Sequence, residues 1–135
     1  MKEKNTPLTI KDLSKSMMDY RLHSLALLKT MDKAGVPLEK IDPQLMNAWA
    51  ELDADLLEGL AITLKLPPSE LVPQNTAQQM LEMIKQEKEI NKSIIENLPG
   101  KYRKKVNQLL VVGEIVVNES DVYAQLPEIP PINCK

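Results

Sequence analysis

Apolar residues recur along the first third of the chain at alternating spacings of three and four, which is typical of one face of an α-helix. The positions with this spacing are Ile10, Leu13, Met17, Tyr20, Leu27, Met31 and Ala34, with Ser24 at the remaining position of the face. A second stripe, Met18, Leu22, Leu25 and Leu28, widens the face enough to pack against two neighbouring helices. Thr9 with Asp12 predicts the N-terminal capping box, and Gly35 predicts a left-handed residue after the helix.

A second helix is predicted from Asp42 and Pro43, because Asp is a good N-cap and Pro is favoured at the first helical position. Its expected buried face consists of Leu45, Trp49, Leu52, Leu56, Leu60 and Leu64. Pro67 and Pro68 end this helix, since the residue before a proline avoids the helical region.

A third helix is predicted from the capping box of Thr76 and Gln79 to the break at Pro99 and Gly100. Its apolar positions are Met80, Ile84, Ile94, Ile95 and Leu98. The middle of this helix, residues 85–89, is highly polar, and we expect it to lie in solvent.

The last long element begins near Lys101 and keeps helical spacing through Tyr102, Val106, Leu109, Gly113, Val116 and the pair Val122 and Tyr123. Residues 109–117 are also rich in β-branched side chains, so a strand is the alternative there. We favour a helix because the neighbouring segments are helical. Beyond Leu126, Pro127, Pro130 and Pro131 predict an extended tail.

These elements predict an all-α fold, a single-domain bundle of about four helices over residues 1–126 with an extended Pro-rich tail over residues 127–135. A boundary between Pro67 and Asn75 could instead divide the chain into two helical pairs. We favour one domain because two amphipathic helices alone bury too little apolar surface.

Composition does not change the predicted fold. The chain has 135 residues, 43% of them hydrophobic, with no Phe and seven Met. Flexible Met side chains fill irregular cores, and they also suit grooves that accept partner helices. The single cysteine, Cys134, cannot form an internal disulfide, no signal-peptide pattern is visible, and the apolar run 109–117 is too short to span a bilayer. We therefore expect a cytoplasmic protein.

Candidate chemistry is sparse. His23 is the only histidine and is distant in sequence from Cys134, so we expect neither a catalytic pair nor a metal site, and no cofactor. The four glycines are scattered and form no phosphate-binding loop. The sequence therefore favours a function other than catalysis.

Charge is unevenly distributed around a net charge of −2, with two basic and seven acidic residues in the segment 36–73. Within this segment Glu51, Asp55 and Glu58 share one helix face, beside Asp53, and form either a solvated face or a docking surface for a basic partner. The basic run that follows Pro99 and Gly100 opposes the helix dipole and could bind an acidic partner. The residues expected to contact a partner are Glu51, Asp55, Glu58, Lys101, Arg103, Lys104, Lys105 and, in the tail, Ile129, Pro130, Pro131 and Ile132.

Residues 55–71 resemble the closing helices of phage-repressor-type helix-turn-helix domains, in which a helix of the form LLxxLAxxL precedes a short turn and a PxEL segment. The likeness covers 17 of 135 residues. It implies a recognition helix within residues 41–50, where Gln44 and Asn47 could read base edges. That stretch contains no Lys or Arg to neutralise phosphates, so we do not expect nucleic acid as the partner.

The sequence thus favours a non-enzymatic adaptor, chaperone-like factor or small regulator that binds another protein through helix faces and its C-terminal tail. A helix-turn-helix-like, DNA-associated transcriptional regulator is the alternative. A subunit of a homo-oligomer, and an enzyme or ligand carrier, stay open as further alternatives.

Overall fold

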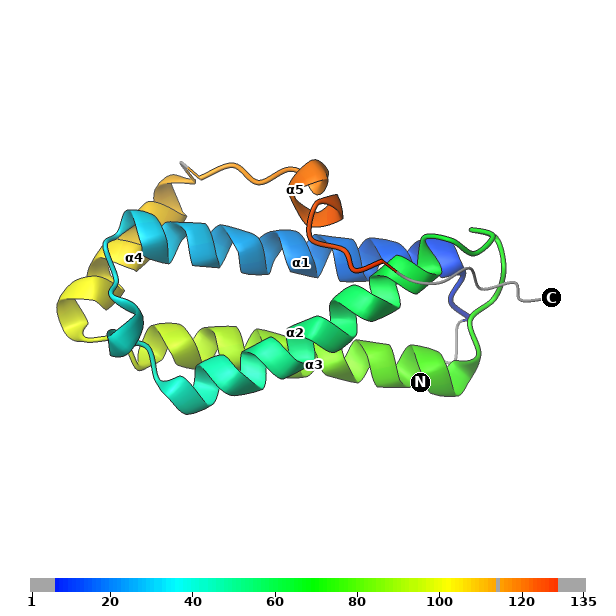
Figure 1. Cartoon of the computed structure of the whole chain (residues 1–135), viewed down its shortest axis with the longest axis horizontal. Coiled ribbons are helices and arrows are strands. Elements are labelled where there is room, and N and C mark those ends of the chain that lie inside the picture. The colour runs from blue at the N-terminus through cyan, green and yellow to red at the C-terminus, as the bar shows by residue number, and fades with distance from the viewer. Residues whose placement is uncertain (1–6, 114, 129–135) are drawn as a thin grey trace, which may run out of the picture.

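The computed structural model describes residues 7–113 and 115–128, and these fold into helices joined by short connections. The helices are α1 (Ile10–Lys33), α2 (Pro43–Thr63), α3 (Gln74–Glu96), α4 (Gly100–Val112) and α5 (Glu119–Tyr123), with a 3-10 turn, η1, at Leu38–Lys40. The three long helices lie along the length of the molecule, α4 lies at one end, and α5 covers the middle of α1 (Figure 1). The predicted all-α fold is confirmed.

Helix α1 forms as its sequence predicts. The Thr9 hydroxyl accepts a hydrogen bond from the backbone N–H of Asp12 at 3.1 Å, and the Asp12 carboxylate accepts one from the backbone N–H of Thr9. Gly35 has a φ of +77°, the left-handed conformation that glycine adopts without steric cost. All eight predicted positions of the first apolar face, including Ser24, are buried.

Helix α2 begins as predicted, with Asp42 accepting a hydrogen bond from the backbone N–H of Gln44 at 2.9 Å and Pro43 at the first helical position. It ends at Thr63, before Pro67. Leu56 and Leu60 are buried, but Leu64 is 41% exposed, so its predicted burial is wrong. Leu64 is the C-cap residue, where the chain already turns away from the neighbouring helices.

The helix-turn-helix resemblance implied a separate recognition helix within residues 41–50. The structure instead has one continuous helix from Pro43 to Thr63, with no turn between that stretch and residue 55. The following connection is tied to the start of α1, since the N–H of Ile10 donates to the Glu70 carbonyl and the N–H of Val72 donates to the Leu8 carbonyl, each at 2.8 Å.

Helix α3 begins at Gln74, two residues before the predicted cap at Thr76. Pro73 occupies the N-cap position with φ −54°, and its carbonyl accepts the first helical hydrogen bond from Ala77. The proline ring presets this backbone geometry, so the helix starts without the side-chain cap that the sequence predicted.

The predicted long last helix is interrupted. Helix α4 ends at Val112, where Gly113 adopts the left-handed φ of +67°. Residues 115–118 form neither helix nor strand, and α5 then starts at a new capping box made by Asn118 and Asp121. Helical spacing across the break therefore reflects two separate helices. Pro127 and Glu128 have no regular structure, and the rest of the predicted tail, with Cys134, lies outside the described residues.

The core consists of two apolar clusters arranged along the bundle. One contains Leu13, Met17, Leu56 and Leu60, and the other contains Leu27, Met31, Ile94 and Val106. Between them, buried polar residues from α1, α2 and α3 meet. In the described part of the chain no helix is long and apolar enough to cross a membrane.

Replacement of Leu60 by alanine should lower the free energy of unfolding by about 2–5 kcal/mol, because the side chain is only 1% exposed and its removal leaves a cavity. Leu64→Ala, at the C-cap four residues later and 41% exposed, is the matched control and should cost less than about 1 kcal/mol. Urea unfolding of both variants measures the difference, and equal losses would contradict the described packing of α2.

Candidate functional site

The most unusual feature of the molecule is a layer of polar side chains in the middle of its core, here called the polar layer. It consists of Tyr20, Arg21 and Ser24 from α1, Asp53 from α2, and Glu87 and Asn91 from α3, all of them buried. Within α1 and within α3, the residues of the polar layer lie about one helical turn apart. Their side chains therefore share the inward face of each helix.

Arg21 is the positive centre of the polar layer. Its Nη2 lies 3.3 Å from Oδ2 of Asp53, and both side chains are 7% exposed. The same guanidinium nitrogen donates to the side-chain oxygen of Gln125, just after α5, and the guanidinium lies 5.6 Å from the centre of the Trp49 ring. Arg21 thus joins α1 to α2 and to the segment that follows α5.

The remaining members of the polar layer join α1 to α3. The Ser24 hydroxyl donates to Oε2 of Glu87 at 3.2 Å. The Asn91 amide nitrogen donates to the Tyr20 hydroxyl at 2.8 Å and to the Ser24 hydroxyl oxygen at 3.0 Å. Each long helix is therefore linked to another by polar contacts inside the core.

The carboxyl groups of Asp53 and Glu87 are close enough to change each other's pKa. Burial, reinforced by the hydrogen bond to Asp53 and by its charge, raises the pKa of Glu87 to about 8. Burial also raises the pKa of Asp53, but the hydrogen bond from Glu87 and the charge of Arg21 oppose that shift. At neutral pH, Glu87 is therefore protonated, and the ion pair with Arg21 favours an ionised Asp53, so that the charges of the polar layer cancel.

Burial also raises the pKa of the Tyr20 hydroxyl, and the neighbouring Glu87 carboxyl raises it further. Tyr20 is consequently a neutral hydrogen-bond partner and not a proton donor at physiological pH.

The two carboxyl groups of the polar layer are almost closed off from solvent. Glu87 is fully buried, and the cavity beside it, bounded by Met17, Tyr20 and Leu60 among others, has a volume of about 10 Å³. That volume holds one water molecule at most, so no organic substrate reaches the carboxyl pair. We interpret the layer as an element that fixes how α1, α2 and α3 align.

A groove of about 560 Å³, here called the α1/α3 groove, lies next to the polar layer. Helix α1 contributes Ala26 and Leu27, and α3 and α4 contribute Ile95 and Leu110, to its apolar surface. The charged residues around it are Lys85, Lys88, Glu89 and Lys92, with His23 from α1. Asn91 belongs to both the groove and the polar layer.

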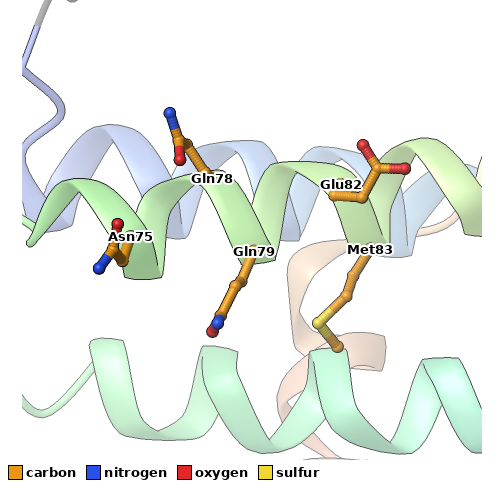
Figure 2. Close-up of a pocket in the computed structure, with 5 residues that line it drawn as sticks. All are labelled: Asn75, Gln78, Gln79, Glu82 and Met83. Atoms are coloured by element: carbon orange, nitrogen blue, oxygen red, sulfur yellow. The ribbon is translucent and has the colours of Figure 1, made fainter.

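A second hollow, of about 600 Å³, lies on the first half of α3 and is lined by Asn75, Gln78, Gln79, Glu82 and Met83. Figure 2 shows that Gln79 and Met83 point toward α2, whereas Gln78 and Glu82 point away from it. Because its polar groups do not converge, this hollow is a weaker candidate than the α1/α3 groove.

The predicted contact residues lie on two helices. Glu51, Asp55 and Glu58 are exposed on α2, but Asp53, which the sequence places in the same acidic group, is buried against Arg21. The predicted tail contacts, residues 129–132, lie outside the described residues.

The basic run is exposed on the first turns of α4, where it comprises Lys101, Arg103, Lys104 and Lys105. Two of these residues also have structural contacts. The Arg103 guanidinium donates to the Glu96 carbonyl at 3.1 Å near the end of α3, and the Lys101 ammonium lies 4.9 Å from the centre of the Tyr102 ring.

Sequence reasoning missed two features of the site. Residues 85–89 were predicted to lie in solvent, which is wrong for Glu87. Its spacing of three from Ile84 and seven from Ile94 was the available signal, because both of these residues face the core. Val116, predicted on an apolar face, is 73% exposed because the chain has left the helix at Gly113.

Comparison of this chain with known protein families, curated proteins and solved structures finds no match. Among the described residues, no three His, Cys, Asp or Glu side chains are grouped closely enough to hold a metal ion.

Replacement of Glu87 by glutamine tests whether Glu87 is protonated in the folded chain. Folding raises the pKa of Glu87 from 4.5 to about 8, so the folded chain binds more protons than the unfolded chain between these values. The wild-type free energy of unfolding should fall as pH rises through this window, by at most about 1.4 kcal/mol per pH unit for one proton. Glu87→Gln should remove most of this slope, as measured by urea unfolding from pH 5 to 9.

The control for this experiment is Glu82→Gln, which removes an exposed carboxyl from the same helix and should keep the wild-type pH dependence. A Glu87→Gln variant with the same slope as the wild type would show that Glu87 is ionised in the folded chain.

Replacement of Arg21 by methionine should cost about 3–5 kcal/mol of unfolding free energy, because it leaves the buried Asp53 carboxylate without its counter-charge. Lys15→Met breaks an exposed ion pair on the same helix, between Lys15 and Asp19 at 3.3 Å, and should cost less than about 0.5 kcal/mol. Chemical unfolding at pH 7 compares the two variants, and similar small losses would refute the structural role of Arg21.

Proposed function

We propose that this chain is a non-enzymatic protein-binding module, acting as an adaptor, chaperone-like factor or small regulator, and that it docks through the exposed end of α4. The observation that carries this proposal is a run of apolar side chains in water. Val111, Val112 and Val116 are 87%, 68% and 73% exposed, and Leu110 beside them is 38% exposed. These four residues are here called the α4 apolar surface.

Apolar side chains grouped in this way are typical of interaction sites. Full burial of one valine or leucine side chain stabilises a contact by about 1.5–3 kcal/mol, so a partner that covers the α4 apolar surface gains several kcal/mol. Within the described residues, Val106 is the one buried side chain of α4, Tyr102 and Leu109 pack partly against the core, and residues 110–112 are exposed.

Charge on the same helix supports a protein partner. Lys101, Lys104 and Lys105 are exposed on the turns before the α4 apolar surface. Basic residues at the rim of an apolar contact increase the association rate of an acidic partner and orient it. The combination of an apolar end and a basic start favours a partner with an acidic border around its own apolar contact.

The proposal that the chain is not an enzyme is supported by the lack of space for a substrate at its buried carboxyl groups. The carboxyl groups with raised pKa values, Asp53 and Glu87, are buried beside a cavity of about 10 Å³, and a catalytic carboxyl must touch its substrate. The single cysteine supports a cytoplasmic location in this proposal. Glu51, Asp55 and Glu58 remain proposed as a second, acidic contact surface.

The double variant Val111→Lys, Val112→Lys tests the proposal in cells of the natural source. We expect it to recover at least about tenfold less of the proteins that co-purify with the wild-type chain, because charged side chains oppose burial at the interface. Leu38→Lys is the matched control, since Leu38 is 78% exposed at a different place and should leave recovery unchanged. Quantitative mass spectrometry after affinity purification provides the measurement.

Equal recovery with both variants would overturn docking through α4. If the wild-type chain recovers only its own copies, the homo-oligomer alternative replaces the adaptor. If it instead retards duplex DNA at micromolar concentration, with an affinity that falls as salt rises, the DNA-associated alternative replaces it.

A further inference from the structure

The α1/α3 groove combines an apolar floor with unpaired positive charge, and we propose that it binds an acidic amphipathic helix of a partner protein. This inference rests on the proposed protein-binding function and names the chemistry of the partner. It concerns a surface separate from most of the α4 apolar surface, so the two can be tested apart.

The floor of the groove offers an apolar strip. Leu27 is buried, Ala26 and Ile95 are half-buried, and Leu110 lies at the α4 side. Leu110 also belongs to the α4 apolar surface, so the groove continues into the surface already proposed for docking. A helix laid on this strip would bury its own apolar face, which is the recurrent way in which amphipathic helices bind grooves.

The border of the groove carries lysines without counter-charges. Lys85, Lys88 and Lys92 are spaced by three and four residues, which places them on one side of α3. All three are exposed, and none forms an ion pair within residues 7–113 and 115–128. Carboxylates along the flank of a partner helix would find three cations at matching helical intervals.

The size of the groove agrees with a helical occupant. From Lys85 to Ile95 the α3 backbone rises by about 15 Å, close to three helical turns. A segment of roughly ten residues, with three or four apolar positions on one face, covers that length. The volume of about 560 Å³ accommodates the side chains of those positions.

The position of Glu89 favours a peptide over a polyanion. Glu89 lies between Lys88 and Lys92 in sequence and borders the same groove, so a continuous row of phosphates would meet a carboxylate among the lysines. A peptide can place a neutral or basic residue at that point and acidic residues at the others. The chain also has a net charge of −2, which gives no overall attraction to nucleic acid.

The test uses two synthetic 16-residue peptides with leucine at helical spacing along one face. The acidic peptide has glutamates on the flanks of that face, and its basic twin has lysines at the same positions. Each is titrated into the full-length, nitrogen-15-labelled chain, and backbone amide shifts report where it binds. We expect the acidic peptide to shift the signals of residues 23–27 and 85–95, and to bind at least tenfold more tightly than the basic twin.

The triple variant Lys85→Glu, Lys88→Glu, Lys92→Glu should weaken the acidic peptide at least tenfold and strengthen the basic twin. The matched control, Lys11→Glu, Lys15→Glu, Lys40→Glu, makes the same change in charge at exposed positions outside both proposed surfaces and should change the affinity of the acidic peptide less than threefold. All substituted lysines are exposed, and circular dichroism of both variants should match the wild type.

Equal affinity for the two peptides, shifts confined to residues 101–112, or no shift at millimolar acidic peptide would each overturn the groove proposal. Tighter binding of decanoate than of the acidic peptide at the same residues would overturn it in favour of an anionic amphiphile. The Val111→Lys, Val112→Lys variant should keep its affinity for the acidic peptide. If that variant loses partner recovery and the wild-type chain does not bind the peptide, the groove proposal is refuted and docking through α4 stands.

Discussion

The arrangement of the three long helices depends on charge neutrality inside the polar layer. The buried guanidinium of Arg21 requires a negative partner, and Asp53 supplies it at 3.3 Å. A second ionised carboxylate in the same layer would leave a net negative charge between two apolar clusters. Glu87 therefore keeps its proton, and one positive, one negative and one neutral group complete the core.

Neutrality of this kind selects one alignment of α1, α2 and α3. If α3 slid by one turn along α1, Glu87 would move toward an apolar cluster and Ser24 would lose the carboxyl that it contacts at 3.2 Å. A buried polar group left without its hydrogen-bond partner costs about 1–3 kcal/mol, whereas exchange of one apolar contact for another of similar volume costs less than about 1.5 kcal/mol. The apolar clusters supply stability that tolerates such shifts, and the polar layer discriminates against them.

The sequence predicted features that arise within one helix and missed those that arise between helices. The capping box of Thr9 and the buried face of α1 follow from residues close in sequence, and both are confirmed. The sequence predicts Glu87 in solvent, because its neighbours along the chain are charged and the groups that it contacts lie on α1 and α2. The break at Gly113 was missed since helical spacing resumes at Val122, which α5 buries independently.

The candidate site also has parts that the sequence predicted and parts that it did not. Exposure of Lys101, Arg103, Lys104 and Lys105 was expected from their run after Pro99 and Gly100, and the structure has them exposed. The α1/α3 groove could not be predicted, because its apolar floor exists only where Leu27 of α1 lies beside Ile95 of α3 and Leu110 of α4. The spacing of the lysines on α3 is visible in the sequence, but it indicates a binding site only because the apolar floor lies beside them.

The polar layer and the groove meet at Asn91, and this contact decides how costly binding is. Asn91 is held by hydrogen bonds to Tyr20 and Ser24, and Ser24 in turn contacts Glu87, so this wall of the groove is ordered before any partner arrives. A preordered wall avoids the entropy cost of fixing side chains on binding, about 0.5–1.5 kcal/mol for each long side chain. The exposed end of α4, residues 110–112, lies beyond the buried Val106 and the half-buried Leu109. The polar layer, although closed to organic ligands, therefore fixes one wall of the groove, whereas the exposed side chains of Lys85, Lys88 and Lys92 would still have to be ordered by a partner.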